Sequence, residues 1–238
     1  MSSQSFVFKV TNGVRVAYRY HGVWFPFVLC QRSWIYLSRK IFNSRTFVFA
    51  DTAFHYHIHP YSLDNERTVE VALALDFLRG KSGRGLEVGN VLSYYTPLPH
   101  DIVDKYEQSP GVINEDIVTY APGKKYDWIV TVSTLEHVGF DEQPREPEKI
   151  VTAIERLKEL LDEQGQMLIT MPLGYNPYVD KMFIDSKMDL GEVRFLLRES
   201  ADNQWRQASL DEVVGARYGA PFPCANAVVV ALFSRHAS

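Results

Sequence analysis

A short apolar run that ends in a glycine turn occupies residues 86–93, Leu86-Glu87-Val88-Gly89-Asn90-Val91-Leu92-Ser93. Apolar residues directly before a glycine are typical of a buried strand that ends in a tight turn. A glycine lets the backbone approach a ligand closely, and a nearby carboxylate can bind a cationic or hydroxyl group. We therefore expect this turn to contact a bound small molecule.

Strands and helices alternate along the chain around this turn. Upstream, Asn65 precedes a run with helical spacing of apolar residues, and the clearest helix follows Pro147 and stops at Gly165. Apolar runs typical of strands occupy residues 100–107, 126–134, 166–173, 192–200 and 225–235, and residues 115–120 are a short strand or an edge. This alternation favours a doubly wound α/β fold, a mainly parallel sheet with helices on both faces. Such sheets bind ligands at the carboxyl ends of their strands.

Residues 1–64 have a different character and predict a β-rich N-terminal extension. The segments FVFKV and VRVAYRY flank Asn12-Gly13, a hairpin signal. Residues 1–60 carry a net charge of +6, whereas the rest of the chain carries −10. This basic segment either attracts an anionic substrate, such as a phosphorylated sugar or a lipid headgroup, or docks on the acidic body or on another subunit.

Composition excludes several classes of protein. Of the 238 residues 46% are apolar and 23% are charged, as in soluble globular domains. Two cysteines, Cys30 and Cys224, exclude a disulfide scaffold. The N-terminus lacks a signal-peptide pattern, and the longest apolar stretch, residues 23–30, is too short to span a bilayer. A pI near 6.0 without a basic stripe argues against nucleic acid. We expect a cytoplasmic protein without a membrane span, whose oligomeric state the sequence leaves open.

Acidic residues recur where the next strands end. Asp104 and Glu107 close the second strand and suit a hydrogen bond to the ribose hydroxyls of an adenosine. Asp116, in the segment Glu115-Asp116-Ile117, is placed to accept from an adenine amino group. Each of these residues also has a structural interpretation, as a solvated strand end or the start of a turn.

The ordered set of these motifs resembles the class I S-adenosylmethionine-dependent methyltransferases over residues 65–238. Glu87-Val88-Gly89 looks like the first motif of that family, and residues 133–138, Ser-Thr-Leu-Glu-His-Val, look like the stretch after strand four. The resemblance implies a Rossmann-like, seven-stranded sheet with an antiparallel final strand, and S-adenosylmethionine as cofactor. It divides the chain into an extension, 1–64, and a methyltransferase-like domain, 65–238. The cofactor-binding residues that it implies are Glu87, Gly89, Asn90, Asp104, Glu107, Asp116, Ile117 and Ser133.

The first motif departs from the family pattern. That pattern has glycine at every second position after the acidic residue, whereas this chain has Val91 and Ser93 after Gly89. The departure motivates an alternative function, a non-catalytic binding protein that kept the methyltransferase fold. A nicotinamide-dependent oxidoreductase is disfavoured because GxGxxG is absent.

Histidines are the main candidates for the chemistry. His137, just beyond strand four, is placed to take a proton from a substrate hydroxyl, or else it caps a helix and bonds a neighbouring loop. His55, His57 and His59 alternate as on one face of a strand; we expect a lid or an interface that contacts substrate rather than a metal site. Arg67, in the helix before the first motif, is a further substrate candidate, with helix capping as its alternative.

These observations together predict an enzyme that transfers a methyl group from S-adenosylmethionine to a small hydroxylated acceptor. A cluster of imidazoles, tyrosines and arginines suits a small molecule or a carbohydrate, because such groups donate to hydroxyls and phosphates alike. The predicted reaction is O-methylation of a sugar or a related metabolite.

Overall fold

The computed structural model describes residues 25–42, 45–185 and 187–235. The chain divides into two compact units, residues 1–44 and residues 45–238, and each is described by itself. The hairpin predicted around Asn12-Gly13 lies outside the described residues. Residues 45–64 belong to the same compact unit as the sheet, while the functional division predicted at residue 64 stays a prediction.

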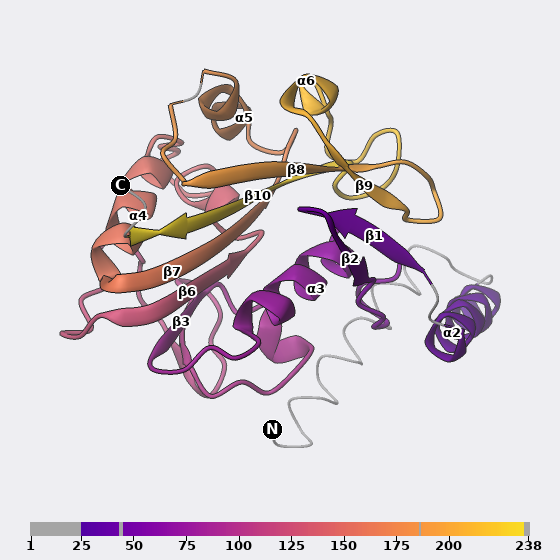
Figure 1. The fold of residues 1–238 in the computed structure, drawn as a ribbon, viewed down its shortest axis with the longest axis horizontal. Coiled ribbons are helices and arrows are strands. Elements are labelled where there is room, and N and C mark those ends of the chain that lie inside the picture. The colour runs from indigo at the N-terminus through magenta and orange to yellow at the C-terminus, as the bar shows by residue number, and fades with distance from the viewer. Residues whose placement is uncertain (1–24, 43–44, 186, 236–238) are drawn as a thin grey trace. The chain divides into compact units, whose positions relative to one another are not determined.

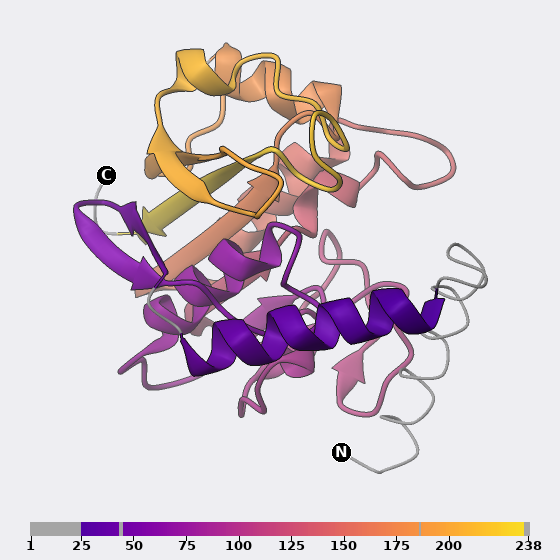
Figure 2. The same ribbon diagram turned by 90° about the vertical axis from the view of Figure 1, so that its right-hand side faces the viewer.

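In the first unit the described structure is one helix, α2 (Phe25–Ile41). It is the long indigo helix that runs across Figure 2. Arg39 and Lys40 lie in its last turn, where cations interact favourably with the carbonyl end of a helix.

The second unit is built on a large mixed sheet. A small antiparallel hairpin precedes it, β1 (Thr46–Phe49) and β2 (Thr52–His55). The strands of the main sheet, in chain order, are β3 (Gly85–Val88), β4 (Asp101–Val103), β5 (Val112–Ile113), β6 (Tyr126–Val132), β7 (Leu161–Pro172), β8 (Glu192–Arg198), β9 (Trp205–Ala208) and β10 (Ala227–Ser234). The helices are α3 (Arg67–Leu78), α4 (Lys149–Leu160), α5 (Pro177–Ile184) and α6 (Leu210–Val213), with short 3-10 turns η2 (Leu92–Tyr94) and η3 (Leu135–His137).

The order of the strands is β5-β4-β3-β6-β7-β10-β8-β9. The part from β3 to β8 can be followed in Figure 1. From β5 to β7 every neighbouring pair is parallel, and β10 is antiparallel to both β7 and β8. The predicted doubly wound α/β fold with an antiparallel final strand is therefore confirmed. The sheet has eight strands, one more than expected, because β9 pairs with the edge of β8.

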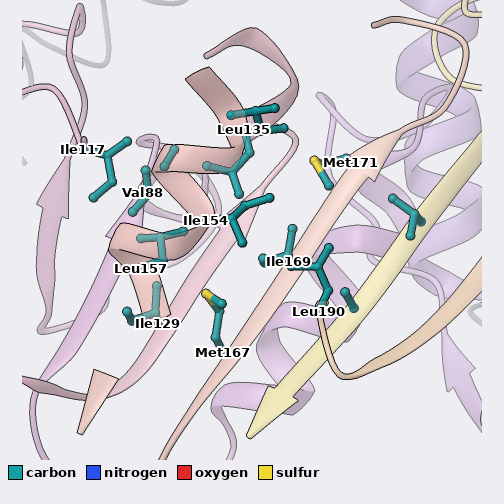
Figure 3. Packing of buried hydrophobic residues seen from close by; sticks show 14 of the residues in the cluster. Val88, Ile117, Ile129, Leu135, Ile154, Leu157, Met167, Ile169, Met171 and Leu190 are labelled. Atoms are coloured by element: carbon teal, nitrogen blue, oxygen red, sulfur yellow. The ribbon is translucent and has the colours of Figure 1, made fainter. Parts of the chain in front are cut away.

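Two helical layers cover the sheet because successive side chains of each strand point to opposite faces. Ile129, Met167 and Ile169 pack under α4, where Ile154 and Leu157 meet them (Figure 3). The alternate residues of the same strands, such as Val130 and Leu168, join a second cluster with α3 on the other face, which also contains Val69 and Leu73. Burial on both faces explains the near-continuous apolar strands of the sequence.

Residues 115–120, expected to be a short strand or an edge, form a turn instead. The backbone N–H groups of Thr119 and Tyr120 donate to the carbonyl of Asp116, and that of Val118 donates to its side chain. The strand beside β4 is Val112–Ile113, earlier in the chain. A carboxylate that caps its own turn competes with sheet pairing. The side chain of Asp116 does so here, and this is why residues 115–120 do not form the expected strand.

Candidate functional site

A pocket of about 510 Å³ opens at the carboxyl ends of β3, β4 and β6, where this class of sheet binds ligands. Its volume lies in the usual range for small-molecule sites. The sequence-predicted residues that line it are Gly89, Asn90, Asp104, Glu107, Asp116, Ile117, Ser133 and His137. Four segments far apart in the sequence thus meet around one volume.

The turn after β3 has its shape fixed by Gly89 and Glu87. Gly89 has a φ of +82°, and a Cβ added there would lie 2.1 Å from Thr134 Oγ1, so glycine is required. Glu87 is fully buried and does not line the pocket. Its carboxylate accepts from the backbone N–H groups of Val91 and Leu92, at 2.8 and 2.6 Å, and lies 2.7 Å from His100 Nε2. Glu87 therefore holds the turn from beneath.

Asp104 and Glu107 lie side by side at the end of β4. One carboxylate oxygen of Asp104 accepts from the N–H groups of Tyr106 and Glu107, both at 2.8 Å. Oε1 of Glu107 accepts from Asn90 Nδ2 at 2.7 Å and from the hydroxyl of Tyr94 at 3.1 Å. These bonds connect the end of β4 to the turn after β3 and give the pocket an acidic wall.

Asp116 belongs to an ion-pair network at the rim of the pocket. Lys105 and Lys149 each lie within 3.0 Å of both Asp116 and Glu142. Burial alone would raise the pKa of Asp116, but hydrogen bonds from the two lysines outweigh it and lower that pKa. Asp116 is thus an ionised, well-held carboxylate, and the buried Ile117 beside it supplies an apolar wall.

Ser133 joins the pocket to a buried charged cluster behind it. Its φ is +39°, rare for a residue with a side chain, and its hydroxyl donates to Glu70 Oε1 at 2.6 Å. Glu70 also forms an ion pair with Arg67 at 2.5 Å. Burial alone would lower the pKa of Arg67, but the neighbouring carboxylates of Glu70 and Glu66 raise it. Arg67 is therefore held behind the pocket, and it is not among the lining residues.

His137 lies in η3 at the pocket wall, and its side chain is 47% exposed. Its Nδ1 is 2.5 Å from Asp141 Oδ2, which also accepts from the hydroxyl of Tyr175 at 2.6 Å. Burial alone would raise the pKa of Asp141, but the hydrogen bonds from Tyr175 and His137 outweigh it and lower that pKa. The ionised Asp141 accepts a hydrogen bond from Nδ1–H of His137, so Nε2 is the ring nitrogen that faces no donor in this pair and can accept a proton.

Glu136 is the most unusual group near the pocket. Its side chain is 1% exposed, and Oε2 has no hydrogen-bond partner among the described residues. Its other oxygen, Oε1, lies 3.5 Å from His137 Nε2. Burial, reinforced by the nearby charge of Glu70, raises the pKa of Glu136 well above its ordinary value. Buried carboxyls with raised pKa values are frequent in functional sites.

The three histidines of residues 55–59 do not form one strand face. His55 ends β2 and is exposed, whereas His57 and His59 follow the strand and lie against each other and against Tyr95. Burial and then the neighbouring His59 lower the pKa of His57 to about 4, so His57 is neutral near pH 7. Within the described ranges no group of three or more potential ligands has the geometry for a metal ion.

Sequence reasoning missed several residues of the site. Asp141 stands four residues after His137, a helical spacing that offered a signal for the pair. Glu136 was passed over because an isolated glutamate carries no pattern. Lys149 and Glu142 lie in segments whose pairing with Asp116 depends only on the fold.

Comparison with protein families and with curated proteins gives no match. Similar solved structures include the N-methyltransferase NodS from Bradyrhizobium japonicum WM9 in complex with S-adenosyl-L-homocysteine, at 15% identity and a TM-score of 0.47, covering 84% of this chain and 97% of that chain. A SAM-dependent methyltransferase from Thermotoga maritima matches at 16% identity and a TM-score of 0.42, covering 68% and 86%. A TehB-like methyltransferase from Corynebacterium glutamicum matches at 15% and 0.39, covering 68% and 84%.

The order and directions of the strands define the class of fold independently of these matches. The parallel strands β5 to β7, with the antiparallel β10 inserted between β7 and β8, form the Rossmann-like sheet that the resemblance to the class I methyltransferases predicted.

Proposed function

We propose that this protein transfers a methyl group from S-adenosylmethionine to a small hydroxylated acceptor, by O-methylation of a sugar or a related metabolite. The observation that carries the proposal is the lining of the pocket. Residues 116–117, the acidic end of β4, the glycine turn and the residues Ser133, Thr134, His137 and Val138 meet there, in this order along the strands β5, β4, β3 and β6.

The residues present fit an adenosyl cofactor. Asp104 and Glu107 offer carboxylate oxygens for ribose hydroxyls, and Ile117 with Val103 and Val138 offers apolar surface for a flat base. When bound, S-adenosylmethionine supplies an electrophilic methyl group.

His137 is the proposed general base. The ionised Asp141 orients its ring, and Tyr175 holds Asp141 in turn. Nε2 then takes the proton of an acceptor hydroxyl as that oxygen becomes a nucleophile. Glu136 lies beside the imidazole but does not line the pocket, and we assign it no step in the transfer.

The acceptor end of the site is proposed to include Arg67, His57 and His59. Tyr95 links them, because it contacts both histidine rings and interacts electrostatically with Arg67. We infer that residues 1–64 act as a lid or a substrate segment, as the sequence predicted. An acceptor with several hydroxyls would find both donors and acceptors in this cluster.

The alternative, a binding protein without turnover, rests on Val91 and Ser93. Val91 lines the pocket with a φ of −100°, so a β-branched residue is accommodated there without backbone strain. The hydroxyl of Ser93 donates to the side chain of Asn90. Side chains therefore stabilise the turn after β3 at positions where the family has glycines. This arrangement is compatible with ligand binding, which both the enzyme and the binding protein require.

The test is the transfer of labelled methyl groups. The protein is incubated with methyl-labelled S-adenosylmethionine and a panel of neutral, amino and nucleotide-linked sugars, and labelled product is measured beside the His137→Ala variant. The proposal expects product from the wild type with at least one sugar. If S-adenosylhomocysteine binds but no sugar is labelled, the O-methylation proposal fails and the binding-protein alternative holds.

A further inference from the structure

Helix α2 presents a stripe of apolar side chains that the cofactor site does not explain. Cys30, Trp34, Leu37 and Ile41 follow one another at intervals of four, three and four residues, so they share one side of the helix. Trp34 is 73% exposed, Leu37 50% and Ile41 70%, and Cys30 is exposed as well. Large apolar groups clustered on one exposed helix face indicate a binding surface.

The charge of this segment has one sign only. Residues 1–44 contain six lysines and arginines and no aspartate or glutamate. In α2 itself, Arg39 and Lys40 lie near the end of the stripe, and helical spacing places Arg39 on the side opposite the stripe and Lys40 at its edge. Lys40 lies along Tyr36, with Nζ 3.1 Å from its hydroxyl. The stripe itself therefore contains no charged residue, and the two cations of the last turn lie at its edge and on the opposite side.

We propose that α2 binds the surface of an anionic lipid bilayer and lies in its interface. Interfacial helices bury an apolar face at the level of the headgroups while basic residues on the polar face meet anionic lipids. Tryptophan is enriched at that depth, and long basic side chains reach out to the headgroups. Among the described helices, none is both long and apolar enough to cross a membrane.

The charge of this segment favours an anionic bilayer over a second copy of the chain as the partner of the stripe. Two copies paired through this stripe would bring together two segments that each carry six positive charges and no negative one, and such like charges repel. An anionic bilayer neutralises them, because basic residues near the surface are attracted to its negative potential.

The experiment is flotation of the full chain with vesicles of phosphatidylcholine mixed with phosphatidylglycerol, against vesicles of phosphatidylcholine alone. The proposal expects binding to the mixed vesicles, weaker binding at high salt, and little binding to phosphatidylcholine. Trp34→Ser and Ile41→Ser should each lower the partition coefficient about tenfold, because each removes a large apolar side chain from the interface. Lys40→Glu should also lower it about tenfold.

Ile184→Ser is the matched control, because Ile184 is an exposed isoleucine on another helix, α5. It should bind vesicles as the wild type does. Equal binding by Ile41→Ser and Ile184→Ser, or no binding of the wild type to mixed vesicles, would overturn the proposal. Sedimentation in the absence of lipid completes the test, since a dimer that Trp34→Ser converts to a monomer would assign the stripe to self-association instead. Binding of S-adenosylhomocysteine, measured in parallel, reports on the proposed cofactor site separately.

Discussion

His137 has the surroundings of a histidine whose orientation is fixed by a carboxylate. Asp141 holds Nδ1, Tyr175 holds Asp141, and the ring of Tyr175 contacts that of His137 edge-on at 4.8 Å. Two of these three contacts come from a different segment of the chain, the loop after β7. The position of Nε2 is thus set by packing as well as by the short η3 turn.

Replacing His137 by Ala should lower turnover by about 10²–10⁴, the usual contribution of a positioned general base. Affinity for S-adenosylhomocysteine should hold, since the acidic wall of the pocket is untouched. Tyr175→Phe removes only one hydrogen bond to Asp141 and should have a smaller effect in the same direction. Product formation with labelled cofactor measures both, and unchanged turnover in His137→Ala would remove this residue from the mechanism.

Glu136 should make the stability of the protein depend on pH in a particular direction. Burial raises its pKa in the folded protein, so folding favours the protonated form. The contribution of Glu136 is therefore greatest at acid pH and declines as pH rises from about 4.5 toward the raised value, by at most about 1.4 kcal/mol per pH unit. The amide of Glu136→Gln does not titrate, so the free energy of unfolding of this variant should fall less than that of the wild type over the same pH range.

Urea unfolding of wild type and Glu136→Gln at a series of pH values measures this difference. Glu155→Gln is a suitable control, because Glu155 lies on the exposed side of α4. A difference between wild type and Glu136→Gln that does not change with pH would contradict the buried, protonated state of Glu136.

At the scale of the elements, the turn after β3 depends on one glycine and one buried carboxylate. Gly89→Ala combines a positive φ with a collision against Thr134, whereas Gly111→Ala combines a similar φ, +86°, with open space. Gly111→Ala should therefore cost only the backbone term, about 1–2 kcal/mol. Gly89→Ala should cost more and should weaken binding in the pocket. Denaturant unfolding compares the two, and equal costs would show that the contact with Thr134 is unimportant.

The strands could be predicted from sequence because they are buried on both faces and read as continuous apolar runs. The prediction of a strand over residues 115–120 was wrong, because the carboxylate of Asp116 caps a turn there. The strand β9 was not predicted, because it is a four-residue strand at the edge of the sheet. In the site, residues at strand ends such as Asp104 were predictable, because the fold brings strand ends together. Glu136 and Lys149 were not, since their roles come from partners distant in the sequence.

At the scale of the whole molecule, the two units carry opposite charge and separate chemistry. The basic N-terminal unit contains the apolar stripe of α2, whereas the acidic unit contains the pocket. Removal of membrane binding by Trp34→Ser should leave S-adenosylhomocysteine affinity unchanged, because the cofactor residues all lie in residues 87–142. The same titration used for the cofactor measures this independence.

The most direct test of the central claim is isothermal titration of the full chain with S-adenosylhomocysteine, with NAD as the comparison ligand. The account predicts one site for S-adenosylhomocysteine and none for NAD. Asp104→Asn and Glu107→Gln, which keep the size of each side chain, should each weaken binding by about 1–3 kcal/mol, or one to two decades in Kd. Absence of binding by the wild type, or unchanged affinity in both variants, would contradict the account.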